Sequence, residues 1–286
     1  MPHLRTLARG TLLLGTLGLA MLGATAQAAE TWEVLPPTPH LAGPFKTAEV
    51  NGVQLAYHIE GKGTPVFLLH GGPANADYLA GQAKALSTHY QVISVDTRGH
   101  GRSNANGLPL SYDAMADDVV GLMKQLGLGK ADVVGWSDGG ITALDLAMRY
   151  PDKVGRIIAF GANTDPTGAF PDADKKPAFG TFITRAADEY KQLSPTPDGF
   201  EKLNAALAQM YQQQPNWTPA QLATIKAPTL IVDGDHDEAI KPDHTRYIAK
   251  SIPGAKLQFI EGTSHFAFLQ KPEVFNKVML DFLAKR

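Results

Sequence analysis

Short apolar runs alternate with helix-length segments along most of this chain. The runs long enough for buried strands are 66–69, 92–95, 133–135, 156–160, 230–232 and 257–260. Their continuous apolar character is typical of strands covered on both faces, and the intervening lengths suit crossover helices. The pattern therefore predicts an α/β fold with a mostly parallel sheet and helices on both faces.

Two further runs, 45–50 and 53–60, flank Asn51-Gly52 and precede this alternation. Asn-Gly is the pair best suited to the positive φ angles of a two-residue hairpin turn. We therefore expect an antiparallel hairpin at the edge of the sheet, which brings the number of strands to eight.

One intervening segment shows where a helix should begin and end. A single apolar face at helical spacing is formed by Met115, Val119, Leu122, Met123 and Leu126. Ser111 is placed to cap the first turn, and Gly127 suits the left-handed position after the last turn, with Leu128 packing back.

The regular alternation stops between residues 163 and 227, a stretch too long for a simple loop. Spacing of Leu203, Leu207 and Met210 predicts one helix there, and Thr218-Pro219 resembles the capped start of another. We interpret 163–227 as a small helical lid. Its aromatic residues either line a substrate pocket or hold the lid together; they are Phe179, Phe182, Tyr190, Phe200, Tyr211 and Trp217.

Residues 1–28 are typical of an export signal. Arg5 and Arg9 precede an apolar stretch, 11–22, that is too short for a stable membrane anchor, and Ala26-Gln27-Ala28 offers a cleavage site. The alternative is an uncleaved helix at a membrane interface. We expect a mature chain of 29–286 that forms one α/β domain including the 163–227 insertion. We expect it to be periplasmic or secreted, without membrane association after cleavage.

Charge and cysteine content exclude several classes of function. Without the two signal arginines, 24 of the 26 basic residues remain against 28 acidic ones, a net charge of −4. This balance argues against nucleic-acid binding. The chain has no cysteine, so disulfides, thiolate nucleophiles and thiolate metal sites are excluded.

The strongest chemical signal is GWSDG at 135–139, which matches G-x-S-x-G between a strand and a helix. A serine hydroxyl is a poor nucleophile and must be exposed at a tight turn where a base can reach it, which makes Ser137 the candidate nucleophile. The competing interpretation is a glycine-rich turn without catalytic importance.

A base and an acid should follow the serine, each in a loop after a late strand. His265 follows the last strand and is the candidate base; Asp237, in the DGDHD segment after the preceding strand, is the preferred acid. Asp233 and Asp235 crowd the same segment, and Asp235 is the alternative acid.

Backbone donors for an oxyanion are expected where HGGP, at 70–73, follows a strand. Pro73 has no N–H, so we predict that the N–H groups of Gly72 and Asp138 form the oxyanion hole. His70 and His100 are expected to be structural. His236 and His244 lack the spacing of a metal site, so no metal is expected.

These motifs, together with DTRGHGRS at 96–103, resemble the α/β-hydrolase superfamily in order and position. GWSDGGITAL and the following YPDKV and AFGAN segments are similar to the valacyclovir hydrolase, or biphenyl hydrolase-like, branch. The resemblance implies hydrolysis of small esters, including α-amino acid esters, without a cofactor. It implies Ser137, Asp237 and His265 as the triad, and Asp138 as the carboxylate beside the nucleophile.

The sequence is also compatible with other functions. HGGP is also similar to proline iminopeptidases, and lactonases and carbon–carbon bond hydrolases share the triad. A ligand-binding protein on the same fold is the alternative outside enzymes. For the Asp138 side chain, one hypothesis is a contact with a substrate ammonium, and the other is capping of the next helix or pairing with a lid residue such as Arg185. The sequence makes no prediction of the oligomeric state.

Overall fold

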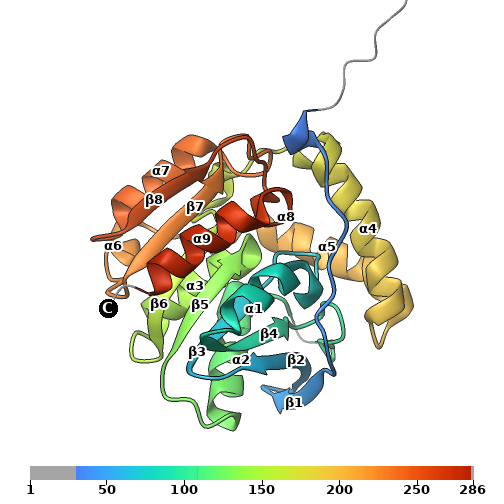
Figure 1. Ribbon diagram of the computed structural model, residues 1–286. Coiled ribbons are helices and arrows are strands. Elements are labelled where there is room, and N and C mark those ends of the chain that lie inside the picture. The colour runs from blue at the N-terminus through green and yellow to red at the C-terminus, as the bar shows by residue number, and fades with distance from the viewer. Residues whose placement is uncertain (1–29, 108, 285–286) are drawn as a thin grey trace, which may run out of the picture.

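The computed structural model describes residues 30–107 and 109–284 (Figure 1). The predicted signal peptide and its cleavage site lie outside the described residues. Among the described helices, none is long and apolar enough to cross a membrane.

An eight-stranded sheet runs through the molecule in the order β1-β2-β4-β3-β5-β6-β7-β8. The strands are β1 (Lys46–Val50), β2 (Val53–Gly61), β3 (Thr64–Leu69), β4 (Tyr90–Asp96), β5 (Ala131–Trp136), β6 (Val154–Phe160), β7 (Thr229–Gly234) and β8 (Lys256–Ile260). β2 is antiparallel to both β1 and β4, and all other neighbours are parallel. The predicted fold class is confirmed, including the antiparallel hairpin at the edge, where Asn51 and Gly52 have φ angles of 49° and 80°.

Side chains alternate between two apolar cores, one on each face of the sheet. Phe67 and Val133 belong to one core, whereas their neighbours Leu68 and Val134 belong to the other. This alternation follows from the two-residue period of a strand. The helices pack on these two faces (Figure 1).

The first core is covered by α2 (Tyr112–Gln125), α3 (Asp138–Arg149), α6 (Pro219–Leu222) and α7 (Pro242–Ser251). The second is covered by α1 (Ala80–Leu86), α8 (Ala267–Gln270) and α9 (Pro272–Leu283). Short 3-10 helices are Thr31–Glu33, Ala76–Leu79, Pro166–Gly168, Ala173–Lys175 and Pro197–Gly199. The site described below therefore lies on a sheet that is packed from both sides.

The segment 163–227, between β6 and β7, contains α4 (Pro177–Leu193), α5 (Phe200–Tyr211) and α6. Figure 1 shows α4 and α5 at one end of the sheet, with the N-terminal arm running along α4. Phe182 of α4 is buried, with its ring centroid 5.5 Å from that of Trp136. This helical insertion thus packs against the residue that immediately precedes Ser137.

Helix α2 begins and ends where its sequence indicates. The Ala114 N–H donates to Ser111 Oγ over 3.1 Å, Gly127 adopts a φ of 68°, and the Leu128 N–H donates to the Met123 carbonyl over 2.9 Å. These contacts satisfy backbone groups that have no partner within the helix.

Replacement of Ser111 by alanine should remove the cap and leave the Ala114 N–H without this acceptor. We expect Ser111→Ala to lower the free energy of unfolding by about 1 kcal/mol, and Ser111→Asp to retain the wild-type value because a carboxylate caps equally well. Urea denaturation with unchanged m-values provides the measurement. Equal stability of Ser111→Ala and the wild type would contradict a capping role.

Candidate active site

Ser137 occupies a strained turn between β5 and α3. Its φ and ψ angles are 54° and −118°, outside the conformations that a serine ordinarily adopts. Its N–H donates to the Phe160 carbonyl over 2.8 Å, and its neighbours Trp136 and Asp138 are buried. Ser137 itself is only half-buried, as a nucleophile at such a turn must be.

Glycines make this turn sterically accessible. A Cβ on Gly135 would lie 2.1 Å from the Gly139 carbonyl oxygen, and a Cβ on Gly139 would lie 2.1 Å from the Leu69 carbonyl oxygen. A Cβ on Gly71 would lie 2.8 Å from the Ser137 Cβ. The glycines of the G-x-S-x-G motif are therefore required by close backbone packing of α3 on β3 and β5.

His265 and Asp237 meet in the loops that follow β8 and β7. The His265 Nδ1 lies 2.7 Å from Asp237 Oδ2, and both residues are buried. The other carboxylate oxygen of Asp237 accepts the N–H groups of Ala239 and Ile240, each over 2.7 Å. Asp235 is exposed and instead accepts the Thr263 N–H over 3.2 Å, so the structure brings Asp237 and not Asp235 against His265.

The two partners shift each other's pKa. Burial alone raises the pKa of Asp237, but the charge and hydrogen bond of His265 outweigh it and hold the pKa below its ordinary value. Burial alone lowers the pKa of His265, but the charge and hydrogen bond of Asp237 outweigh it and raise the pKa. The arrangement therefore favours an imidazolium beside a carboxylate.

Ser137 and His265 lie close together at the carboxyl ends of the parallel strands, Ser137 after β5 and His265 after β8. The Phe160 carbonyl that accepts the Ser137 N–H precedes Gly161, where a Cβ would lie 2.7 Å from His265 Cε1. The Trp136 ring centroid is 5.7 Å from that of the imidazole. No hydrogen bond in the described chain joins Ser137 Oγ to His265, a bond that often tightens only when substrate binds.

The HGGP loop is fixed beside the serine by buried polar contacts. His70 Nδ1 contacts the Gly71 carbonyl over 2.8 Å, and His70 Nε2 accepts the Thr97 N–H over 3.1 Å. Burial lowers the pKa of His70 to about 4 and that of His100 to about 3, so both imidazoles are neutral. The two histidines have the environment expected of structural residues.

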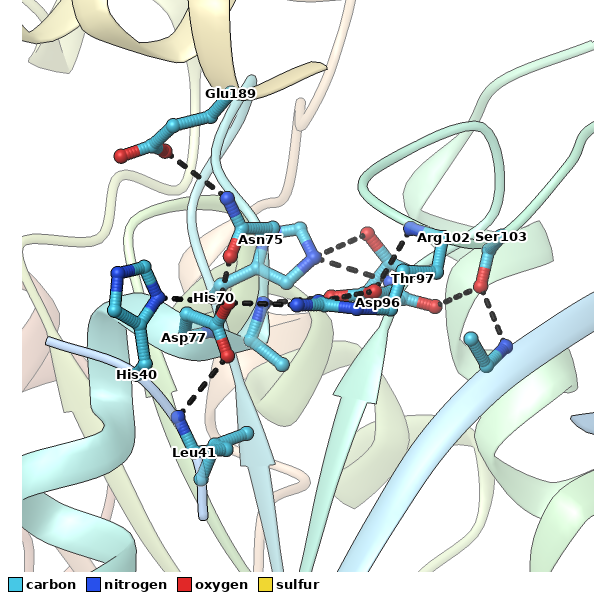
Figure 2. A network of polar contacts seen from close by, with 12 residues as sticks. His40, Leu41, His70, Asn75, Asp77, Asp96, Thr97, Arg102, Ser103 and Glu189 are labelled. Atoms are coloured by element: carbon cyan, nitrogen blue, oxygen red, sulfur yellow. Dashed lines mark hydrogen bonds and ion pairs between the residues drawn. The ribbon is translucent and has the colours of Figure 1, made fainter. Parts of the chain in front are cut away.

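A polar network joins the segment that follows this loop to Asp96 and Arg102 (Figure 2). Asp96, which is fully buried, accepts the Ala76 N–H over 2.7 Å and the Arg102 N–H over 2.8 Å. Arg102 also contacts Asp77 over 2.7 Å, and Asn75 contacts Glu189 of α4 over 3.0 Å. The network thus links residues 75–77, which follow the HGGP loop, to the helical insertion.

Asp138 has its carboxylate held by two tyrosines, a contact that the sequence does not predict. Tyr112 Oη donates to Oδ1 over 2.9 Å, and Tyr211 Oη from α5 donates to Oδ2 over 2.8 Å. Burial raises the pKa of Asp138 to about 6, although the tyrosine hydroxyls, the charge of His265 and the Gly72 amide all act in the opposite direction. A lid residue does pair with Asp138, but it is Tyr211.

Arg185, considered above as the lid partner, points elsewhere. Its guanidinium donates to the carbonyl groups of Leu35 and Pro36, because this part of α4 faces the N-terminal arm. Arg185 is therefore not the lid residue that contacts Asp138.

Gly72 lies against this carboxylate. A Cβ at Gly72 would lie 2.4 Å from Asp138 Oδ2 and 2.5 Å from Tyr211 Oη. The Gly72 amide also favours the charged form of the Asp138 carboxyl. The structure thus brings together the two residues predicted to supply oxyanion donors, and it places the side chain of one beside the amide of the other.

Comparison with known proteins identifies the family. The profile described as "Alpha/beta hydrolase family" matches residues 66–278. This chain belongs to that family. It is 30% identical to the human serine hydrolase BPHL over 262 residues, covering 82% of this chain and 84% of the relative.

Two further similar proteins have names that indicate other hydrolytic reactions. A 2-hydroxy-6-oxo-6-phenylhexa-2,4-dienoate hydrolase from Comamonas testosteroni is 27% identical, covering 80% of this chain and 91% of the relative. The solved enol-lactonase from Burkholderia xenovorans LB400 is 26% identical with a TM-score of 0.68, covering 84% of this chain and all of that one. The chain is thus an α/β hydrolase with relatives among serine hydrolases, lactonases and carbon–carbon bond hydrolases.

Glu238 is a neighbour of the histidine that the sequence analysis did not single out. Its Oε2 accepts the backbone N–H of His265 over 3.1 Å, and burial raises its pKa. The only sequence signal was its position directly after Asp237. Within residues 30–107 and 109–284, no group of three or more acidic or histidine side chains is arranged to hold a metal ion.

The environment of His265 predicts a measurable pKa. We expect its imidazole to titrate above the ordinary value of about 6.5 in the folded protein, because the Asp237 carboxylate stabilises the charged form. In Asp237→Asn the same imidazole is buried without that charge, so its pKa should fall below the wild-type value. NMR titration of the histidine ring gives both pKa values, and an unchanged value in Asp237→Asn would contradict the pairing.

Proposed function

We propose that this hydrolase cleaves small carboxylic esters through an acyl-enzyme formed on Ser137. The observation that carries the proposal is the 2.7 Å contact between His265 Nδ1 and Asp237 Oδ2, made at the sheet edge where Ser137 occupies its strained turn. The human relative at 30% identity is named a serine hydrolase, which supports the same class.

The proposed reaction begins with proton transfer from Ser137 Oγ to His265 Nε2. The contact with Asp237 occupies Nδ1, which leaves Nε2 as the free acceptor. The Oγ attacks the ester carbonyl, and collapse of the tetrahedral intermediate expels the alkoxide, which takes the proton from His265. Water then attacks the acyl-enzyme with His265 again as base, releasing the acid and restoring Ser137.

The N–H groups of Gly72 and Asp138 stabilise the oxyanion in this scheme. Each such donor contributes roughly 3 to 4 kcal/mol to the transition state in comparable enzymes. Asp138 begins α3, so its N–H is also at the positive end of a helix dipole. Both amides belong to backbone that packed glycines and buried histidines hold in place.

A lactone is the second substrate class that a specific observation favours. The enol-lactonase neighbour has a TM-score of 0.68 and 26% identity, and lactone opening uses the same acyl-enzyme. The carbon–carbon hydrolase and proline iminopeptidase alternatives use related sites and belong in the same substrate panel. Labelling by a fluorophosphonate that Ser137→Ala abolishes would distinguish all of these enzymes from a ligand-binding protein.

The proposal for Asp138 is that its carboxylate favours esters carrying an α-ammonium group. Its position one residue after Ser137 supports this selectivity, because an acyl group on Ser137 lies beside it. The tyrosine hydroxyls on both carboxylate oxygens are the competing partners.

We also propose export of the mature chain to the periplasm or medium, after cleavage near Ala29. The basic, apolar and small-residue segments of 1–28 support it.

The triad assignment predicts large losses of turnover. Ser137→Ala, His265→Ala and Asp237→Asn should each lower kcat on a small ester by roughly 10⁴-fold or more, and double variants should be hardly slower than single ones, because the three residues act as a unit. Circular dichroism should show an intact fold. Asp235→Asn is the matched control and should retain activity; loss in that variant alone would move the acid to Asp235.

The ammonium hypothesis predicts a substrate-dependent effect. At about pH 7, above the Asp138 pKa of about 6 and below the α-amino pKa of about 7.7 to 8.0, Asp138→Asn should lower kcat/KM for an α-amino acid ester roughly tenfold more than for the deaminated analogue, because only the former loses an ion pair. Tyr211→Phe is the matched control, since it keeps the carboxylate and removes one competing hydroxyl. An equal decrease for both esters in Asp138→Asn would contradict the hypothesis.

A further inference from the structure

Asp233 is a carboxyl group placed where the sheet otherwise carries apolar side chains. It ends the Leu230, Ile231 and Val232 run of β7 and pairs in register with Phe259 of β8. Its exposed fraction is 0%. A polar group buried without full compensation is costly, and an aliphatic side chain would pack here at lower cost. An interaction of the Asp233 carboxyl group must therefore offset the free-energy cost of its burial.

The contacts of Asp233 lead to the proposed catalytic acid. Its Oδ1 accepts the Gly234 N–H over 2.9 Å, and its other oxygen contacts the hydroxyl of Thr245 from α7. Its carboxyl group also lies close enough to that of Asp237 for the two to form a hydrogen bond. Such a bond requires a proton between the two acids, because two carboxylates offer only acceptors.

Hydrogen bonding places that proton on Asp233. Asp237 receives three N–H donors, from Ala239, Ile240 and the His265 ring, and all three stabilise its charged form. Asp233 receives one N–H and one hydroxyl contact, and its pKa is raised well above the ordinary value by burial and by the charge of Asp237. The other titratable groups near the pair are His265 and Glu238.

We propose that Asp233 is a positioning residue for catalysis, which donates its carboxyl O–H to Asp237 and thereby fixes the carboxylate that orients His265. The proposal rests on the proposed function, since it assigns Asp237 and His265 the roles given above. An ionised carboxyl has about four acceptor positions, of which the three N–H donors fill three and the Asp233 O–H the fourth.

The consequence is a carboxylate held on all sides and less basic than one with fewer donors. When His265 takes the Ser137 proton, Asp237 must stabilise the imidazolium without removing its Nδ1 proton. A fourth donor keeps the negative charge on Asp237 and its Oδ2 directed at the ring. Loss of the donor should therefore affect the chemical step more than substrate binding.

The test compares Asp233→Leu, which has similar size but no donor, with Asp233→Asn, whose amide N–H can still donate to Asp237. We expect Asp233→Leu to lower kcat roughly 10- to 100-fold. This is the rate factor that corresponds to the loss of a whole hydrogen bond to a charged group in the transition state. KM should stay unchanged, and the free energy of unfolding should stay equal or rise because a buried polar group is gone. Asp233→Asn should retain kcat to within roughly threefold.

Thr245→Val is the matched control, because it removes the hydroxyl contact of Asp233 and leaves the carboxyl pair intact. An unchanged kcat in Asp233→Leu, or an equal loss of kcat in Thr245→Val, would overturn the proposal. The infrared difference spectrum between wild type and Asp233→Asn at about pH 7 gives a readout independent of folding of the leucine variant. In Asp233→Asn a protonated carboxyl band of the wild type should disappear. If the two proteins show no difference in this band, the assignment is overturned.

Fluorophosphonate labelling of the wild type separates this inference from the proposed function. Failure to label Ser137 would remove the nucleophile and with it the proposed function. Labelling of Ser137 together with full activity of Asp233→Leu would overturn only the role of Asp233.

Discussion

The backbone conformation of Ser137 is the constraint on which the rest of the site depends. A serine with a φ of 54° is unfavourable unless its surroundings hold it in place. Here the surroundings are backbone: the Phe160 carbonyl of β6 accepts its N–H, and the Leu69 carbonyl of β3 lies where a Cβ on Gly139 would be. Three neighbouring strands, β3, β5 and β6, thus hold one residue in place. Because these strands are parallel, their carboxyl ends meet on the same side of the sheet and bring these contacts together.

The same edge concentrates buried acids, and each is compensated differently. Asp237 is charged because N–H donors and an imidazole surround it. Asp138 accepts two tyrosine hydroxyls, which stabilise its charge less, so its pKa stays near 6. Asp233 accepts one N–H and one hydroxyl, and in the arrangement proposed above it stays neutral beside the charged Asp237. Protonation therefore follows the number and kind of donors each carboxyl receives at similar burial.

The sequence could predict what is repeated or local. Apolar runs marked the eight strands, Ser111 and Gly127 marked the ends of α2, and the order of Ser137, Asp237 and His265 along the chain matched three loops at one sheet edge. It could not predict contacts that depend on how the insertion packs. Tyr211 lies 73 residues from Asp138, and nothing in the spacing of α5 indicates that its hydroxyl reaches that carboxylate. The burial of Asp233 could not be predicted for a related reason. A DGDHD segment is typical of an exposed loop, and only the structure shows that β7 includes its first acid.

The two tyrosines on Asp138 are not equivalent, and the difference bears on how a ligand could reach the carboxylate. Tyr112 is buried at the start of α2 and belongs to the core of the domain. Tyr211 belongs to the insertion, and 38% of it is exposed. In the ammonium hypothesis a cation approaching Oδ2 would compete with the Tyr211 hydroxyl, whereas Oδ1 would stay bound to Tyr112. Any free energy gained from the ion pair is reduced by the cost of breaking the Tyr211 contact, and it is thereby coupled to the position of α5 over the site.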